Sequence, residues 1–261
     1  MLLWLLHFTF WYIMYMIVYY KCSPRHIDPS STAQRKGVTE LPKCMCQIVH
    51  ALYTCAYGYG YFLDWFSIET LYMARAGSTA FLFFDFIYTW RNYDRFKAIS
   101  EFTEQYHSRP SKHTSAFLNT HHPGGVAFHH IITLLFLYGF RFGGTVTISG
   151  CVLFFQGELP VFFLQVFWLY CYYGLQDTTR VASLVSNLAV FTYFLCRIVM
   201  FLGYFLVAIF FPHMDFSSPV SWAFTGLLAV IFWFNWMWFE GLVKQNKEYF
   251  PGGYCAEDQI V

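Results

Sequence analysis

The chain has 261 residues, of which 57% are hydrophobic and 12% are charged, and its formal net charge is +1. Soluble domains contain about 45 to 50% apolar and about 25% charged residues, so this composition excludes an ordinary soluble enzyme. A mean hydropathy of +0.41 favours a protein that crosses a membrane several times. Because the net charge is close to zero, it gives no reason to expect a nucleic-acid partner.

Apolar runs of about 20 residues, the length that crosses a bilayer, recur in seven places. They cover residues 2–20, 44–66, 71–90, 126–141, 145–173, 182–211 and 220–242. The first run has no basic start and no cleavage site, which favours a retained anchor over a cleaved signal peptide. The fifth run is long, and we expect it to kink at Pro160. We therefore predict an all-α, polytopic membrane protein with seven transmembrane helices in one bundle.

The distribution of Lys and Arg predicts the orientation of this bundle. With seven crossings, 13 of the 16 basic residues fall on one side, two (Arg75 and Arg141) fall on the other, and Arg197 lies within a span. The 13 are Lys21, Arg25, Arg35, Lys36, Lys43, Arg91, Arg95, Lys97, Arg109, Lys112, Arg180, Lys244 and Lys247. Because basic residues concentrate on the cytosolic side, we predict the N-terminus outside and the C-terminus on the cytosolic side.

These spans indicate three regions. We expect residues 1–43 to form an N-terminal anchor with a basic loop, residues 44–243 to form a six-helix membrane domain, and residues 244–261 to form a polar tail. The eight cysteines contain no CxxC pair, so we expect no disulfide framework.

Ionisable side chains within a membrane are costly, so each of them indicates a candidate functional site. Counted at about 1.5 Å per residue, Asp85, His129 and His130 lie at similar depths near the inner side. The same inner third holds three further polar residues, His50, Asn187 and Asn235. We predict an inward-opening polar cavity in which one histidine acts as base or nucleophile and Asp85 orients it.

The alternative is that these polar groups only satisfy each other's hydrogen bonds and charges. Adjacent helical residues point about 100° apart, so at most one histidine faces Asp85 squarely, and the sequence leaves open which one.

Two opposite charges lie deeper in the predicted membrane. Glu158 and Arg197 each lie roughly 22 Å along their spans, estimated from the helical rise, and either charge alone would be costly there. We predict that they form a buried ion pair. Such a pair serves either as a staple between helices or as part of a site.

A cluster of histidines raises the question of a metal site. Six histidines occur from His107 to His130, the others being His113, His121, His122 and His129. Membrane di-iron hydroxylases carry several HxxxH and HxxHH boxes, which this chain lacks, and carboxylate ligands at suitable spacing are also missing. We therefore expect no metal.

Five strings, taken in order, resemble the TLC-domain family, which includes the ceramide synthases. They are FFDFIYTW with Asp85, HHIIT from His129, GELPVFFLQVFW with Glu158, CRIVMF with Arg197, and WFNWMWFEGL in the last span. The resemblance covers about residues 44–243. Ceramide synthases share the HHxxT string but follow it with two aspartates on the next span, where this chain reads FQGELPVFF. That string looks more like the TLCD branch of the family.

The resemblance implies a helical bundle that acts on or holds membrane lipids. The first hypothesis is N-acyl transfer from acyl-CoA, a co-substrate, to a sphingoid base, with no bound cofactor. His129 or His130 would then remove the amine proton or carry the acyl group, and Asp85 would orient the histidine. The inner-loop cations Arg91, Arg95 and Lys97 would meet the CoA phosphates. The resemblance further implies the endoplasmic reticulum.

The second hypothesis is a non-catalytic accessory or lipid-binding subunit of a larger membrane complex, which the missing aspartate pair favours. Such a subunit would also fit the mitochondrial inner membrane. A receptor has the same seven-span plan, but the Asp/Glu-Arg-Tyr triplet and the Asn-Pro-x-x-Tyr motif are missing from the expected places.

Overall fold

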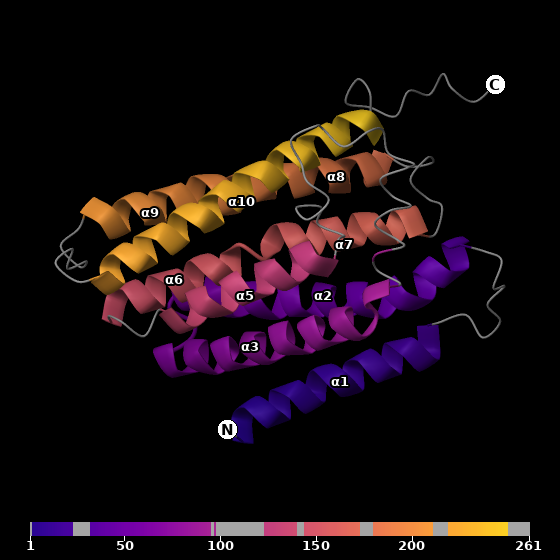
Figure 1. The fold of residues 1–261 in the computed structure, drawn as a ribbon, viewed down its shortest axis with the longest axis horizontal. Coiled ribbons are helices and arrows are strands. Elements are labelled where there is room, and N and C mark those ends of the chain that lie inside the picture. The colour runs from indigo at the N-terminus through magenta and orange to yellow at the C-terminus, as the bar shows by residue number, and fades with distance from the viewer. Residues whose placement is uncertain are drawn as a thin grey trace. The chain divides into compact units, whose positions relative to one another are not determined.

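The computed structural model describes residues 2–22, 32–94, 97, 123–139, 144–172, 180–210 and 219–249. The regular elements in these residues are all helices, as the sequence predicts (Figure 1). In chain order they are α1 (Leu2–Cys22), α2 (Thr32–Phe62), α3 (Ile68–Arg91), α5 (Pro123–Gly139), α6 (Gly144–Gln156), α7 (Leu159–Tyr172), α8 (Arg180–Tyr193), the π-helix η3 (Phe194–Val199), α9 (Met200–Phe210) and α10 (Pro219–Tyr249). Each of the seven apolar runs thus corresponds to one helix or to two or three successive helices.

The chain divides into two compact units, and α2 and α3 each contribute to both. The first unit comprises Met1–Cys46 and Ala76–Leu135, and the second comprises Gln47–Arg75 and Phe136–Val261.

In the first unit, α1 packs on α3 through aromatic side chains. Trp11 is 1% exposed, and its ring lies 5.0 Å from the ring of Phe81. Its Nε1 donates a hydrogen bond of 3.1 Å to the carbonyl of Gly77. The rings of Tyr15 and Tyr88 lie 4.6 Å apart. Because a buried indole N–H needs an acceptor, the Trp11 bond fixes how far α1 can slide along α3.

Helix α2 begins well before the apolar run that it contains. It starts at Thr32, whereas the run starts at residue 44, so the expected boundary between residues 43 and 44 falls inside a helix. Hydropathy marks where apolar residues begin and not where helical backbone begins, and the first third of α2 is polar. At the other end of the chain, α10 continues to Tyr249, beyond the expected boundary at residue 243.

A short turn in the second unit connects α2 to α3. Asp64 has a φ of 58°, the left-handed conformation that commonly follows a helix end. Ser67 precedes α3, and its hydroxyl accepts a hydrogen bond from the backbone N–H of Thr70, as a helix-capping residue does. A hydrogen bond with the same hydroxyl lowers the pKa of the exposed Glu69.

The kink predicted at Pro160 is confirmed as a break between α6 and α7. Gly157 and Glu158 separate the two helices, and Pro160 occupies the first turn of α7, where its missing N–H costs no helical hydrogen bond. The N–H of Val161 donates to the carbonyl of Glu158 at 3.0 Å. In a continuous α-helix this N–H would donate to the carbonyl of Gly157. The Gly157 carbonyl is therefore left for a hydrogen-bond donor outside the helix.

The remaining helices of the second unit surround this break. Helix α8 continues through η3 into α9 as one rod in Figure 1. The ring of Phe194 in η3 lies 5.4 Å from the ring of Phe239 in α10, and that of Phe201 in α9 lies 6.4 Å from that of Phe232. On the opposite side of the break, a Cβ added to Gly58 of α2 would lie only 2.8 Å from the Cβ of Phe155 in α6, so the two helices approach closely there.

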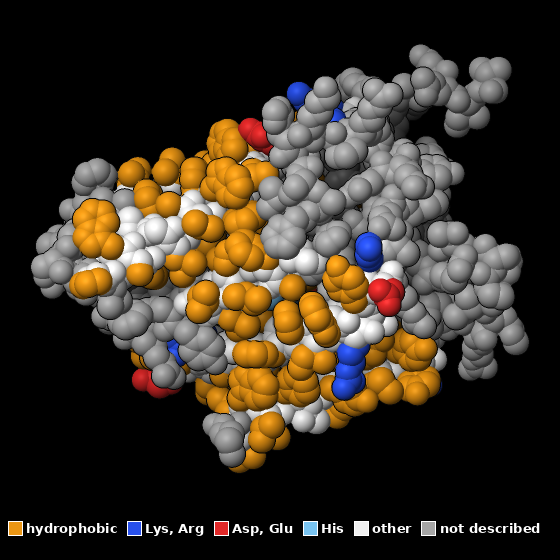
Figure 2. Space-filling view, viewed as in Figure 1, with side chains coloured by type: hydrophobic (Ala, Val, Ile, Leu, Met, Phe, Trp, Pro, Cys, Tyr) orange, Lys and Arg blue, Asp and Glu red, His pale blue; other side chains and the backbone are white. Residues whose placement is uncertain are grey.

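Four stretches of the described helices are long and apolar enough to cross a membrane. They are Leu2–Lys21, Gly150–Phe167, Arg180–Leu206 and Ser221–Lys244, and Gly124–Leu135 is a shorter apolar helix. The described side chains on the face drawn in Figure 2 are mostly apolar, and large apolar residues such as Leu2 (73% exposed) and Trp222 (62% exposed) lie on the surface. Extended exposed apolar surface is compatible with a membrane protein.

Candidate functional site

A buried carboxylate lies at the centre of a polar group in the first unit, which we call the Asp85 cluster. The cluster comprises Lys43 of α2, Asp85 and Thr89 of α3, and His130 of α5. The side chain of Asp85 is 2% exposed and that of His130 is 6% exposed, and His130 Nε2 lies 3.2 Å from Asp85 Oδ2. The expected meeting of Asp85 with one of the two histidines is therefore confirmed, and His130 is that histidine.

The second partner of Asp85 is Lys43, which sequence reasoning missed. Its Nζ lies 3.6 Å from Asp85 Oδ2 and donates a hydrogen bond of 2.9 Å to Thr89 Oγ1. The Lys43 side chain is 11% exposed. Lys43 was predicted only as one of the 13 basic residues on the cytosolic side. The available signal was its position directly before the apolar run, at the same end of the bundle as Asp85.

The two nitrogens of His130 have different surroundings. Nε2 faces the carboxylate, whereas Nδ1 is buried and has no hydrogen-bond partner within the part of the chain that the structure describes. Asp85 Oδ2 likewise has no hydrogen-bond partner among the described residues, so its contact with Nε2 is one between a carboxylate and an imidazole at 3.2 Å. His129 is half-buried, and its ring centroid lies 5.8 Å from that of His130.

The Asp85 cluster has the components of a general base. A histidine is neutral or charged near physiological pH, and a carboxylate on one ring nitrogen leaves the other free to take a proton. The cluster brings the predicted catalytic residues His130 and Asp85 together, and His129 is adjacent to them in sequence.

The second unit contains another buried charged group, which we call the Glu158 cluster and which comprises His50, Glu158, Tyr193 and Arg197. Arg197 Nη2 donates to Glu158 Oε1 at 3.1 Å, so the predicted ion pair is confirmed. Arg197 Nε also donates to the carbonyl of Gly157 at 2.7 Å. This carbonyl is the one that the helix break before Pro160 leaves unpaired, so a single guanidinium satisfies both residues of the break.

The position of Arg197 depends on the π-helix η3. Arg197 lies within η3, and the guanidinium carbon lies 5.3 Å from the centre of the Tyr193 ring one turn earlier. Tyr193 is buried, and its hydroxyl has no hydrogen-bond partner among the described residues. Single π-helical turns are frequent at functional sites, and hydropathy gives no signal for them.

His50 belongs to the Glu158 cluster and not to the layer predicted for it. Its Nδ1 lies 3.7 Å from Glu158 Oε2, and its side chain is 2% exposed. The prediction that His50 lies in the inner third and Glu158 far deeper is wrong, because the two side chains meet. The depth of His50 was counted from residue 44, but α2 begins at Thr32, so His50 lies about 27 Å along its helix.

The two asparagines predicted to line the cavity have different environments. Asn187 of α8 is exposed, and its Oδ1 accepts a hydrogen bond of 3.0 Å from Asn246 Nδ2 of α10. Asn246 also accepts a hydrogen bond from Ser186. These bonds join α8 to α10 and give Asn187 a helix-packing role. Asn235 of α10 is 5% exposed.

The cations predicted to meet CoA phosphates lie at the end of α3 and just beyond it. Arg91, the last residue of α3, and Lys97 are exposed. Arg95 lies outside the described residues. Arg91 follows Asp85 by six residues, or about 9 Å along the helix.

Four of the six histidines considered for a metal site lie outside the residues that the structure describes. They are His107, His113, His121 and His122. Among the described residues, no group of three or more His, Cys, Asp or Glu side chains is placed to hold a metal ion.

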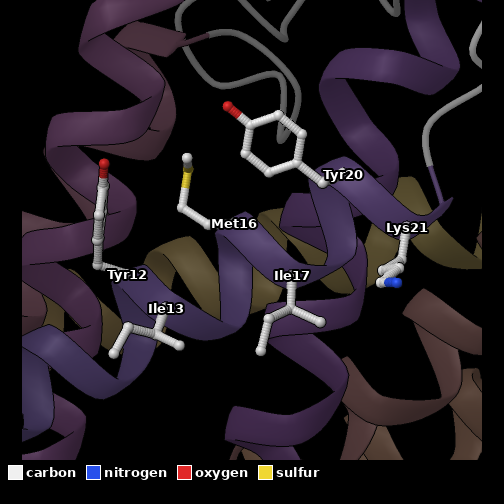
Figure 3. Close-up of a pocket in the computed structure, with 6 residues that line it drawn as sticks. All are labelled: Tyr12, Ile13, Met16, Ile17, Tyr20 and Lys21. Atoms are coloured by element: carbon white, nitrogen blue, oxygen red, sulfur yellow. The ribbon is translucent and has the colours of Figure 1, made fainter.

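A shallow groove also follows the surface of α1. Figure 3 shows its six lining residues, Tyr12, Ile13, Met16, Ile17, Tyr20 and Lys21, all from this one helix. The groove has a volume of about 330 Å³. It is separate from the Asp85 cluster, since none of that cluster's residues lines it.

Comparison with known proteins assigns no relative to the chain, because no protein family, no curated protein and no solved structure matches it.

Proposed function

We propose that this protein is a seven-span membrane protein of the TLC-domain type that transfers an acyl group from acyl-CoA to the amine of a sphingoid base. The N-terminus lies outside and the C-terminus lies on the cytosolic side. The four long apolar helices support the membrane location. The helical state of the other apolar runs and the 13-to-2 split of basic residues support the seven crossings.

The observation that carries the proposal is the buried contact between His130 and Asp85. Ionisable groups at this depth are retained at a cost in stability. His130 has one ring nitrogen beside a carboxylate and the other without a hydrogen-bond partner among the described residues, which is suited to proton transfer. Both side chains are buried, Asp85 on α3 and His130 on α5.

The proposed reaction needs one base and no bound cofactor. The amine nitrogen attacks the thioester carbonyl, the new C–N bond forms, and the C–S bond breaks. His130 accepts the proton that leaves the nitrogen and returns it to the departing CoA thiolate, so the products are an amide and free CoA. The exposed Arg91 and Lys97, together with Arg95, supply positive charge for the CoA phosphates.

The resemblance to TLC-domain proteins supports the sphingoid base as acceptor and the endoplasmic reticulum as location. Acyl-CoA is supplied from the cytosol, which is the side on which the basic residues are expected.

The test is an assay of purified protein in detergent with acyl-CoA and a sphingoid base. We expect His130→Ala to lower kcat by about 100-fold or more, since general-base catalysis contributes that much. His129→Ala, the matched control, should retain most of the activity, because His130 is the histidine that contacts Asp85. Equal product from the unmodified protein and both variants would contradict the proposal.

A second candidate function is an accessory subunit of a larger membrane complex. The observation that favours it is α1, which carries many exposed large apolar side chains and the groove of Figure 3. A neighbouring membrane protein could cover this helix, in the endoplasmic reticulum or in the mitochondrial inner membrane. Isolation in a mild detergent would then return a stoichiometric complex, whereas a clean monomer counts against this candidate.

A further inference from the structure

We propose that Lys43 is a positioning residue of the Asp85 cluster. By keeping Asp85 ionised, Lys43 directs the proton of neutral His130 to Nε2, and Nδ1 is then the atom that takes the proton from the substrate. The role of Nδ1 in the reaction rests on the proposed function, whereas the effect of Lys43 on His130 does not.

The ammonium of Lys43 is held by two residues of α3. It donates to Thr89 Oγ1 at 2.9 Å and lies 3.6 Å from Asp85 Oδ2. Asp85 and Thr89 are four residues apart and therefore lie on the same face of α3. This arrangement holds the charge beside the carboxylate.

Burial makes this charge effective. The side chains of Lys43 and Asp85 are 11% and 2% exposed, so solvent screens the pair less than it screens a surface ion pair. An isolated carboxylate at such a site would take up a proton to become neutral. The nearby ammonium opposes that uptake, because it stabilises the charged form.

The charge of Asp85 decides which nitrogen of His130 carries the proton. His130 Nε2 lies 3.2 Å from Asp85 Oδ2, although this oxygen has no hydrogen bond among the described residues. An ionised carboxylate can only accept a hydrogen bond, so its negative charge favours the hydrogen on the nearby nitrogen, Nε2. A protonated Asp85 could instead donate to Nε2, and the hydrogen of the imidazole would then move to Nδ1. His130 Nδ1, which is buried and has no hydrogen-bond partner among the described residues, is a base only in the first case.

The experiment measures the protonation of His130 directly. Protein with nitrogen-15 histidine is studied in detergent micelles at neutral pH, and the ring signals of His130 are assigned by their loss in His130→Gln. We expect the unmodified protein to show a protonated Nε2 and an unprotonated Nδ1. Lys43→Gln should show a mixture of both forms, and Lys43→Arg, which keeps the charge, should restore the first form. Lys21→Gln, which removes an exposed lysine at the end of α1, is the matched control and should leave the His130 signals unchanged.

The kinetic readout is the division between kcat and KM. We expect Lys43→Gln to lower kcat in proportion to the fraction of His130 that the spectra show with the hydrogen on Nδ1, with KM for the amine almost unchanged. If Lys43→Gln does not fold, Thr89→Val decides, because it removes the hydrogen bond to the ammonium while keeping the side-chain volume, and it should give a smaller shift of the same signals.

An unchanged His130 spectrum in the folded Lys43 variant, or in Thr89→Val where that variant must be used, would overturn the inference. If the unmodified protein forms no product, the proposed reaction fails, and the His130 spectrum alone then decides the role of Lys43.

Discussion

At the scale of single residues, Arg197 is the group on which the second unit most depends. It compensates the buried charge of Glu158 and also satisfies the carbonyl of Gly157. Arg197→Met would remove this compensation, while His50 Nδ1 would still lie 3.7 Å from Glu158 Oε2. Removing one partner of a buried ion pair costs about 3 to 5 kcal/mol. We expect a loss of this size in the free energy of unfolding, measured by denaturant titration in detergent.

Two control variants separate the charge from the hydrogen bonds. Arg197→Lys keeps the charge but loses the two-pronged geometry, so it should fall between Arg197→Met and the unmodified protein. Combining Arg197→Met with Glu158→Gln removes both charges and should recover part of the loss. Stability of Arg197→Met within about 0.5 kcal/mol of the unmodified protein would show that Glu158 has another source of compensation.

The two ion contacts show what residue spacing can and cannot predict. Depth along predicted spans was sufficient to pair Glu158 with Arg197 and Asp85 with a histidine, because buried charges in a membrane need partners. Spacing missed Lys43, since a lysine beside an apolar run resembles any loop cation. It also missed the Gly157 carbonyl, because backbone acceptors become available only where a helix breaks.

At the scale of helices, the close approach of α2 and α6 depends on Gly58. An added Cβ would lie 2.8 Å from the Cβ of Phe155, whereas the same addition at Gly203 of α9 meets nothing within 4 Å. Both positions are helical, so both gain the same intrinsic helix propensity from alanine. Overpacking costs about 1 to 3 kcal/mol, and we expect Gly58→Ala to be less stable than Gly203→Ala by this amount. Thermal unfolding of the two variants in the same detergent measures the difference.

Equal stability of the two alanine variants would mean that α2 and α6 separate at little cost. Phe155 is fully buried and Cys55, one turn before Gly58, donates to the Phe155 carbonyl. These contacts hold the two helices together, so the added methyl group has little room to be accommodated.

The helices themselves were predictable where hydrophobicity decides them. Each apolar run located a helix or successive helices among the described residues, and Pro160 located the break between α6 and α7, because proline cannot continue a helix without a cost. The early start of α2 at Thr32 was not predictable from hydropathy, since polar residues can be helical too. The π-helix η3 was missed for a similar reason, because a change in helical pitch leaves composition unchanged.

At the scale of the whole molecule, α2 is the element that both polar clusters share. It contributes Lys43 to the Asp85 cluster of the first unit and His50, seven residues later, to the Glu158 cluster of the second. A change within α2 is therefore expected to alter both clusters, whereas variants of Asp85 and Arg197, which lie on other helices, should act on one cluster each.

The number of crossings gives the last prediction, because it determines on which side each terminus lies. Seven crossings place the termini on opposite sides, whereas the four long apolar stretches alone would place them on the same side. We expect a C-terminal tag to be labelled by antibody once the plasma membrane alone is permeabilised, and an N-terminal tag only after the internal membranes are opened. Tags that behave alike would contradict an odd number of crossings.

A probe within the chain then separates seven crossings from other odd numbers. Seven crossings put the turn between α2 and α3 on the same side as the N-terminus, so Ser67→Cys should react with an impermeant maleimide only where the N-terminal tag is accessible. Lys97→Cys is the matched probe for the opposite side, and both residues are exposed. The background replaces Cys22, Cys171 and Cys255 and keeps the five cysteines that the structure describes as buried. If α2 and α3 did not cross, the two probes would react on the same side, and the basic residues near them would no longer be separated as the charge rule requires.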